Sequence, residues 1–225
     1  MSAVPAASLD PRLAPIACHE ARAGWATARV VWLSLAVWAL VAAASLWLDG
    51  ARALLALPDP DDAMRLVQVR DLLAGQGWFD LVQHRVNPPD GTPMHWSRLV
   101  DAPIAAMIVG LRPLLGPDAA ERWAVLLWPL VPALLLLPSA GLIGNRLAGA
   151  PGAVLTIIAA GLAVPLVRHF VPGRIDHHNV QMALSMALVA ALVSLPRRPA
   201  AYAAGAASAL SIAVGLETSR SAASP

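Results

Sequence analysis

Long apolar runs separated by short polar segments dominate the pattern of this 225-residue chain. The first run, 30–48, contains no charged residue and has Trp32 and Trp47 near its ends, where interfacial aromatic residues often lie. Further runs cover 123–143, 147–167, 180–195 and, more weakly, 199–216. Each approaches the roughly 20 residues that a helix needs to cross a bilayer. The pattern therefore predicts an all-α integral membrane protein with about five transmembrane helices.

The segments between these runs predict the organisation of the rest of the chain. Residues 1–28, rich in Ala and Pro, are predicted to be a disordered cytoplasmic tail that precedes a transmembrane domain over 29–216. Residues 144–146 are predicted to form a tight turn, 61–74 a helix, and 217–225 a low-complexity tail.

The segment 102–115 decides the predicted topology. It is apolar but short, and Arg112 and Pro113 interrupt it, which is more typical of an interfacial helix than of a span. If it does not span, Arg146 and the arginines at 197 and 198 face the cytoplasm with those near the N-terminus, as the positive-inside rule favours. Residues 49–122 then form a large outer loop with interfacial helices, and 168–179 a second outer loop on the same side.

Composition supports the membrane assignment and adds little to the functional argument. The chain is 58% hydrophobic and 13% charged, whereas about a quarter of the residues of a soluble domain are charged. A net charge of +2 gives no indication of a nucleic-acid partner. The single Cys18 cannot form an internal disulfide.

The two predicted outer loops contain residues with metal-binding chemistry. The segment 59–62 reads Asp-Pro-Asp-Asp, and 176–179 reads Asp-His-His-Asn. Ionisable groups near a bilayer are costly, by roughly 3 kcal/mol each at a helix centre, and are usually functional. Mg²⁺ and Mn²⁺ bind carboxylate oxygens, and Mn²⁺ also accepts imidazole. A site in which both segments meet over one leaflet is therefore one interpretation.

Each segment also has a simpler interpretation. An Asp at a helix start accepts hydrogen bonds from backbone N–H groups, and the predicted helix over 61–74 begins beside Asp59. His177 and His178 can be a polar cap on the end of a helix. Arginines in the loops pair with acids or lipid headgroups as well as with phosphate. Among them Arg174, beside the second segment, is the candidate phosphate ligand.

The order of these features resembles the N-terminal part of the catalytic subunit of oligosaccharyltransferases, among the membrane-embedded GT-C glycosyltransferases. In that family the first outer loop opens with Asp-Pro followed by an Arg, as Asp59 and its proline precede Arg65 here. The second outer loop carries an Asp-x-Asp or Asp-x-Glu motif, where this chain has Asp176 and His178. The resemblance implies that Asp59 and Asp176 are catalytic and bind a metal ion, with His178 in place of the second acid.

The resemblance also implies a function. The chain would transfer a sugar from a polyprenyl-phosphate-linked donor to an acceptor at the periplasmic face of a bacterial inner membrane, with its N-terminus in the cytoplasm. Mg²⁺ or Mn²⁺ would be the cofactor, and Arg174 would contact the donor phosphate. Because the family continues with further spans and a soluble domain, an inactive N-terminal fragment is also expected. The alternative is a non-enzymatic transporter component or assembly subunit, whose polar loops form a solute or partner surface.

Overall fold

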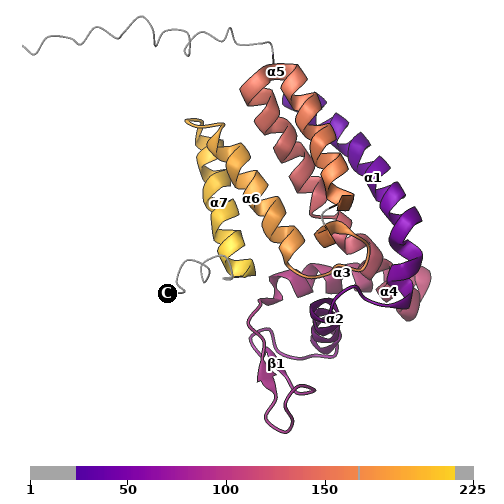
Figure 1. The fold of residues 1–225 in the computed structure, drawn as a ribbon. Coiled ribbons are helices and arrows are strands. Elements are labelled where there is room, and N and C mark those ends of the chain that lie inside the picture. Colours follow the sequence, from indigo (N-terminus) through magenta and orange to yellow (C-terminus); the bar gives the residue numbers. More distant parts are fainter. Residues whose placement is uncertain (1–23, 167, 216–225) are drawn as a thin grey trace, which may run out of the picture.

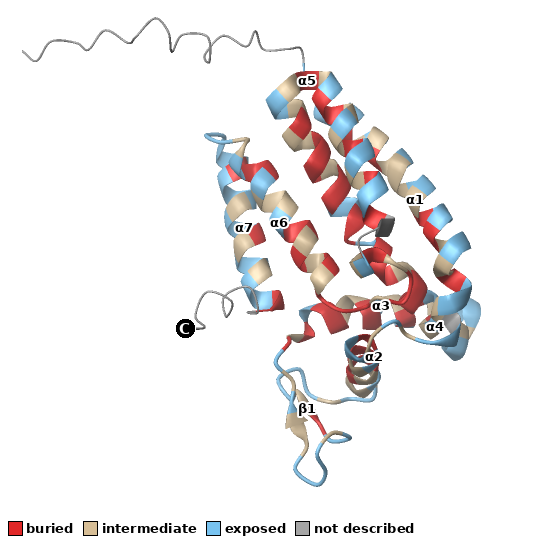
Figure 2. Cartoon of the chain, in the orientation of Figure 1, coloured by how far each residue is buried: buried red, intermediate tan, exposed pale blue. Residues whose placement is uncertain are grey.

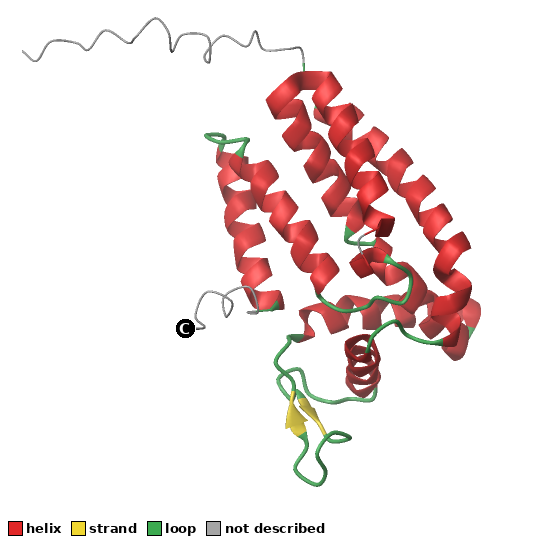
Figure 3. Ribbon diagram, in the orientation of Figure 1, coloured by secondary structure: helices red, strands yellow, loops and turns green. Residues whose placement is uncertain are grey.

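A computed structural model describes residues 24–166 and 168–215, and about 75% of these described residues are helical. In chain order the elements are α1 (Thr27–Leu55), α2 (Pro60–Leu73), β1 (Val82–Gln83), β2 (Thr92–Pro93), α3 (Arg98–Leu115), α4 (Pro117–Leu127), η2 (Trp128–Leu130), α5 (Ala133–Leu166), η3 (Arg168–Phe170), α6 (His178–Leu192) and α7 (Arg198–Val214). Figure 3 shows the two short strands as a small hairpin beside the helices. The predicted helical class is confirmed.

The long helices form a bundle with a cross-layer of shorter helices at one end. Helix α1 packs on α5, α5 on α6, and α6 on α7. Helices α2, α3 and α4 lie across the lower end of the bundle in Figure 1, and the β1–β2 hairpin projects beyond them. We call this the loop end, defined by α2, α3, α4 and the segment 171–177. Both predicted outer loops lie there.

Among the described residues, two stretches are long and apolar enough to cross a membrane, Thr27–Ala53 and Pro117–Val164. Helices α6 and α7 have 15 and 17 residues, which is below the roughly 20 of a typical span. The second predicted span and most of the third fall within the 48-residue stretch, whose backbone turns at Ala148 and Gly149. The structure therefore does not support five spans, although it retains two stretches of sufficient length and apolarity.

Helix α5 reverses direction within its bounds and forms a hairpin of two arms (Figure 1). The backbone leaves helical geometry at Ala148 and Gly149, where Gly149 has a φ of 67°. This left-handed conformation favours glycine, which explains why the turn lies a few residues beyond the predicted position at 144–146. Gly144 lies instead between the arms, where an added Cβ would be 2.3 Å from the carbonyl oxygen of Gly152.

We expect Gly144→Ala to destabilise the hairpin, because the added methyl group would force the two arms apart. Overpacking of this kind lowers the free energy of unfolding by roughly 1–3 kcal/mol. This loss exceeds the gain of about 1 kcal/mol from replacing a helical glycine by alanine. The measurement is the melting temperature in detergent, followed by circular dichroism. Gly110→Ala on α3 is the control, because a Cβ there meets no atom within 4 Å. If Gly144→Ala melts at the same temperature as the parent, the close contact between the two arms is contradicted.

The predicted disordered tail is only partly testable. Residues 1–23 and 216–225 lie outside the described residues. The predicted C-terminal tail, 217–225, falls entirely within the second of these ranges. The end of the predicted N-terminal tail, however, is folded against α5. The backbone N–H of Trp25 donates to Asn145 Oδ1 at 2.8 Å, and Asn145 Nδ2 donates to the carbonyl of Trp25 at 2.9 Å. Residues 24–28 are therefore packed against the bundle or part of α1, and the rest of the predicted tail, 1–23, lies outside the described residues.

Exposed positions follow the outer faces of the bundle (Figure 2), and many of them carry large apolar side chains. Trp32 and Trp47 on α1 are 71% and 87% exposed, and Tyr202 on α7 is 79% exposed. Leu155 and Leu162 on α5 are also exposed. Extended apolar surface of this kind marks contact with lipid or with another protein.

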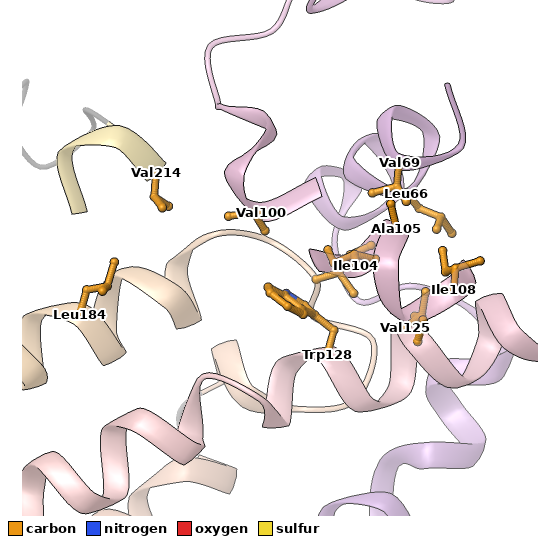
Figure 4. Close-up of a cluster of buried hydrophobic side chains, with 12 residues drawn as sticks. Leu66, Val69, Val100, Ile104, Ala105, Ile108, Val125, Trp128, Leu184 and Val214 are labelled. Carbon is orange, nitrogen blue, oxygen red and sulfur yellow. The ribbon is translucent and has the colours of Figure 1, made fainter. Parts of the chain in front are cut away.

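The loop end has its own hydrophobic core, shown in Figure 4. Leu66 and Val69 of α2 pack against α3 and α4, and Trp128 of η2 lies at the centre of the cluster. The other buried members are Val100, Ile104, Ala105, Ile108, Ala124, Val125, Ile175, Leu184 and Val214. The predicted helix over 61–74 is confirmed as α2, and the segment 102–115 lies within α3. The region predicted as an outer loop is thus a packed layer that fixes the polar groups beside it.

Candidate functional site

The two polar segments meet at the loop end, as the shared-face interpretation requires. Asp62 Oδ1 accepts a hydrogen bond of 3.0 Å from the backbone N–H of Asp176, although 114 positions separate these residues. Arg174 Nη1 lies 2.9 Å from Asp59 Oδ2 and 3.2 Å from Asp62 Oδ2. Arg174 thus bridges the first segment to the second.

Local backbone geometry brings these side chains together. Asp59 is the N-cap of α2, and its Oδ1 accepts a hydrogen bond of 3.1 Å from the N–H of Asp61. The capping interpretation of Asp59 is therefore correct, and it is compatible with the ion pair made by the other oxygen. Gly173 has a φ of 92°, and an added Cβ would lie 3.0 Å from Pro58 Cδ. This close approach places Arg174 beside Asp59.

Asp176 is the centre of the second segment and is 3% exposed. Its Oδ1 lies 2.6 Å from His177 Nδ1, and its Oδ2 lies 2.5 Å from His178 Nδ1. Potential ligand atoms of the three residues all lie within 4.8 Å of one another. A carboxylate that holds two imidazoles fixes the orientation of both rings, which is a common feature of metal sites.

Arg65 lies on the Oδ1 side of Asp176 and is completely buried. Its Nη2 is 3.6 Å from Asp176 Oδ1 and 3.3 Å from His177 Nδ1. One ring nitrogen cannot donate to the carboxylate and accept from the guanidinium at once, and the shorter contact favours donation to Asp176. Arg65 Nη1 donates to Asp101 Oδ1 at 2.7 Å.

These contacts extend into a buried charge network beneath the site. Asp101 Oδ2 lies 3.3 Å from Arg98 Nη1, which also donates to the carbonyl of Gln68 at 2.9 Å. The guanidinium of Arg65 lies 4.9 Å from the ring centroid of Trp96, in cation–π geometry. Because its charges are paired and away from solvent, this network orients Asp176 and His177 and does not itself face a substrate.

Burial and hydrogen bonding shift the pKa values of the acids at the site in different directions. Burial raises the pKa of Asp62 to about 6, although Arg174 acts in the opposite direction. Burial also acts to raise the pKa of Asp176, but hydrogen bonds from His177 and His178 outweigh it and hold this pKa well below its usual range. The N–H of Asp61, followed by Arg174, lowers the pKa of Asp59. Asp59 and Asp176 are therefore carboxylates at neutral pH and suit a cation.

An apolar groove of about 430 Å³ begins at the site and follows α6. His169 and His178 lie at its polar end. The remaining lining residues are Leu136, Gln181, Met182, Ser185, Met186 and Val189. The apolar groove therefore opens on the side of Asp176 where His178 lies.

Sequence reasoning missed His169, which lies on η3 at this junction. Its ring stacks on that of His178, with centroids 4.9 Å apart and 10° between the ring planes. The buried Nδ1 of His169 has no hydrogen-bond partner among the described residues. No motif marked this histidine, because it lies seven positions before Asp176 at the end of an apolar run.

The predicted ligand set of Asp59, Asp176 and His178 is only partly assembled. Asp176 and His178 are in direct contact, whereas Asp59 is joined to the cluster through Arg174. Arg174, the predicted phosphate ligand, lies at the meeting point but is paired with acids. Two carboxylates and neighbouring imidazoles fit a divalent ion such as Mg²⁺ or Mn²⁺ if Arg174 moves away from Asp59.

Comparison with protein-family models, with curated proteins and with solved structures finds no match for this chain. The functional argument therefore depends on the geometry described above.

Proposed function

We propose that this chain is a membrane glycosyltransferase, or the donor-binding part of one, that uses a polyprenyl-phosphate-linked sugar. One observation supports this most directly: the apolar groove along α6 ends at a cluster of acids, histidines and an arginine. The donor has the same order of parts, because a long apolar chain is followed by a phosphate and then by a sugar. The groove would hold the chain and the cluster would hold the phosphate.

In this proposal Asp59 and Asp176 are the catalytic carboxylates, and with His178 they hold Mg²⁺ or Mn²⁺. A bound ion would supply neutralisation of the charge that develops on the departing phosphate. Arg174 would leave Asp59 and contact the donor phosphate, for which guanidinium is a good bidentate partner. As the acceptor attacks the anomeric carbon, the bond from that carbon to the phosphate oxygen breaks and its electron pair stays on the lipid phosphate.

The proposal places the two apolar stretches, Thr27–Ala53 and Pro117–Val164, in a bacterial inner membrane, with the N-terminus in the cytoplasm. The loop end then faces the periplasm, because α1 begins at the opposite end of the bundle and ends beside the loop end (Figure 1). The exposed tryptophans of α1 support contact with lipid along this helix.

A photocrosslinking experiment tests the donor site. Protein in nanodiscs is irradiated with a benzophenone-tagged polyprenyl phosphate, and the labelled peptides are identified by mass spectrometry. We expect labels on the α6 segment that contains Met182 and Met186. We also expect Arg174→Ala to reduce labelling by roughly tenfold or more, because a hydrogen bond to a charged group contributes about 1.5–3 kcal/mol.

The control is Arg52→Ala, which removes an arginine that is 87% exposed near the end of α1. This variant should label as strongly as the parent. Tagged polyprenol without phosphate is the second control and should label weakly. If tagged polyprenol and tagged polyprenyl phosphate label the protein to the same extent, the site does not recognise phosphate. The alternative of a non-enzymatic assembly subunit is then favoured.

A further inference from the structure

We infer that His169 is a ligand of the metal site, which therefore takes a first-row transition ion, Mn²⁺, Fe²⁺ or Zn²⁺, in preference to Mg²⁺. The inference rests on the proposed function for the presence of an ion beside Asp176, and it adds a ligand and a selectivity that the sequence pattern did not provide.

The two oxygens of Asp176 have opposite surroundings. The guanidinium of Arg65 lies 3.6 Å from Oδ1, and His177 occupies the same side. A second positive charge about 4 Å from the guanidinium would cost about 4 kcal/mol at an effective dielectric constant of 20. Oδ2 instead faces His178, at 2.5 Å. A cation is therefore favoured at Oδ2.

His169 lies on this favoured side. Its ring is stacked on that of His178 with centroids 4.9 Å apart, and both rings line the polar end of the groove. Each ring nitrogen binds an ion at about 2.1 Å, so two such ligands can be about 4.2 Å apart at most. The ligand atoms that already lie within 4.8 Å of one another belong to Asp176, His177 and His178, so the stacked ring of His169 must tilt to bring one of its nitrogens to a shared ion.

The unsatisfied nitrogen of His169 supports the assignment. A buried polar atom without a partner costs about 1–3 kcal/mol, and such an atom in a native protein calls for an explanation. His169 Nδ1 is buried and has no hydrogen-bond partner in the described part of the chain. Asn179 Nδ2 donates to the carbonyl of His169 at 3.2 Å and fixes the position of the residue. A metal ion in contact with Nδ1 would satisfy this atom.

The resulting donor set determines the selectivity. His169 and His178 supply two imidazole nitrogens, and Asp176 supplies a carboxylate oxygen. Mg²⁺ prefers oxygen ligands and retains water, whereas imidazole suits Mn²⁺, Fe²⁺ and Zn²⁺. Asp59 becomes a second carboxylate ligand if Arg174 moves to phosphate, and its charge already acts on the pKa of His169.

Metal titration of the purified protein tests the inference without an activity assay. Co²⁺ is added as a spectroscopic probe and followed by visible absorption, and Mn²⁺ is followed by electron paramagnetic resonance. We expect one ion per chain, with Mg²⁺ displacing it only at large excess. His169→Ala should weaken Co²⁺ binding by at least about tenfold and alter the spectrum, as the loss of a ligating imidazole requires. His84→Ala, at an exposed histidine after β1, should bind as the parent does.

Two further variants separate the possible failures. His169→Asp replaces a nitrogen by oxygen ligands and should shift the preference toward Mg²⁺. If Asp176→Ala abolishes Co²⁺ binding while both His169 variants keep the parent affinity, spectrum and selectivity, His169 is not a ligand, but the proposed ion stands. If the parent itself binds no ion at millimolar concentration, the inference and the metal part of the proposed function are both overturned.

Discussion

Replacing Asp176 by Asn should weaken metal binding by more than about 100-fold and reduce sugar transfer in parallel. Mutation of a residue that only hydrogen-bonds to a metal ligand already weakens metal binding by roughly 10–100-fold. Asp176 is proposed to bind the ion directly, so its loss should have a larger effect. The variant removes the negative charge that both imidazoles share. Asparagine has one carbonyl oxygen and one amide nitrogen, so it can accept from His177 or from His178 but not from both.

The measurement is isothermal titration with Mn²⁺, followed by the loss of labelled sugar from a polyprenyl-phosphate-linked donor. Asp71→Asn is the matched control, because Asp71 pairs with Arg85 and is not part of the site. The melting temperature of each variant shows whether it folds. A folded Asp176→Asn protein with the affinity of the parent would remove the physical basis of the metal site.

The convergence of the two polar segments could be predicted because it depends on topology and not on side-chain packing. Only the arrangement in which 102–115 does not span puts both segments at one end, and the distribution of arginines favoured that arrangement. The structure brings the two segments together, since Asp62 and Asp176 are hydrogen-bonded and α3 lies across the bundle end. The helix over 61–74 was predictable for the same kind of reason, because its period and its N-cap are local signals.

The interior of the site could not be predicted in this way. Arg65 and Asp101 are 36 positions apart and belong to different helices, so no spacing in the chain relates them. Asp62, Arg65 and Gln68 do recur at intervals of three along α2, and all three are buried. A stripe of this kind normally faces solvent, so only the tertiary structure shows that α3 and the segment 171–177 cover it.

The predicted number of spans failed because hydrophobicity does not report where a helix bends or ends. The apolar run after residue 117 continues through the turn at Gly149, so composition alone does not divide it at the right place. The run over 180–195 is apolar enough, but α6 ends at Leu192 after 15 residues. The tight packing of Gly144 against Gly152 likewise depends on contacts that a hydropathy pattern does not encode.

Replacing Arg65 by Met should destabilise the fold by about 3–5 kcal/mol, because breaking a buried ion pair leaves an uncompensated charge. Arg65 is fully buried and pairs with Asp101 at 2.7 Å and with Asp176 at 3.6 Å. Without it, Asp101 keeps only Arg98, at 3.3 Å, and the carboxylate of Asp176 loses its nearest cation. Denaturant unfolding in mixed micelles, followed by circular dichroism, measures the change in the free energy of unfolding.

A second substitution separates the lost pair from lost packing. Adding Asp101→Leu to Arg65→Met removes the carboxylate that has lost its closer partner, so the double variant should be more stable than the sum of the two single changes implies. Arg85→Met at the exposed pair with Asp71 is the control and should change stability little, because solvent screens that pair. If Arg65→Met costs no more than Arg85→Met, the buried network does not support the loop end. The position of Asp176 must then depend on the hydrogen bond from its backbone to Asp62 and on its contacts with His177 and His178.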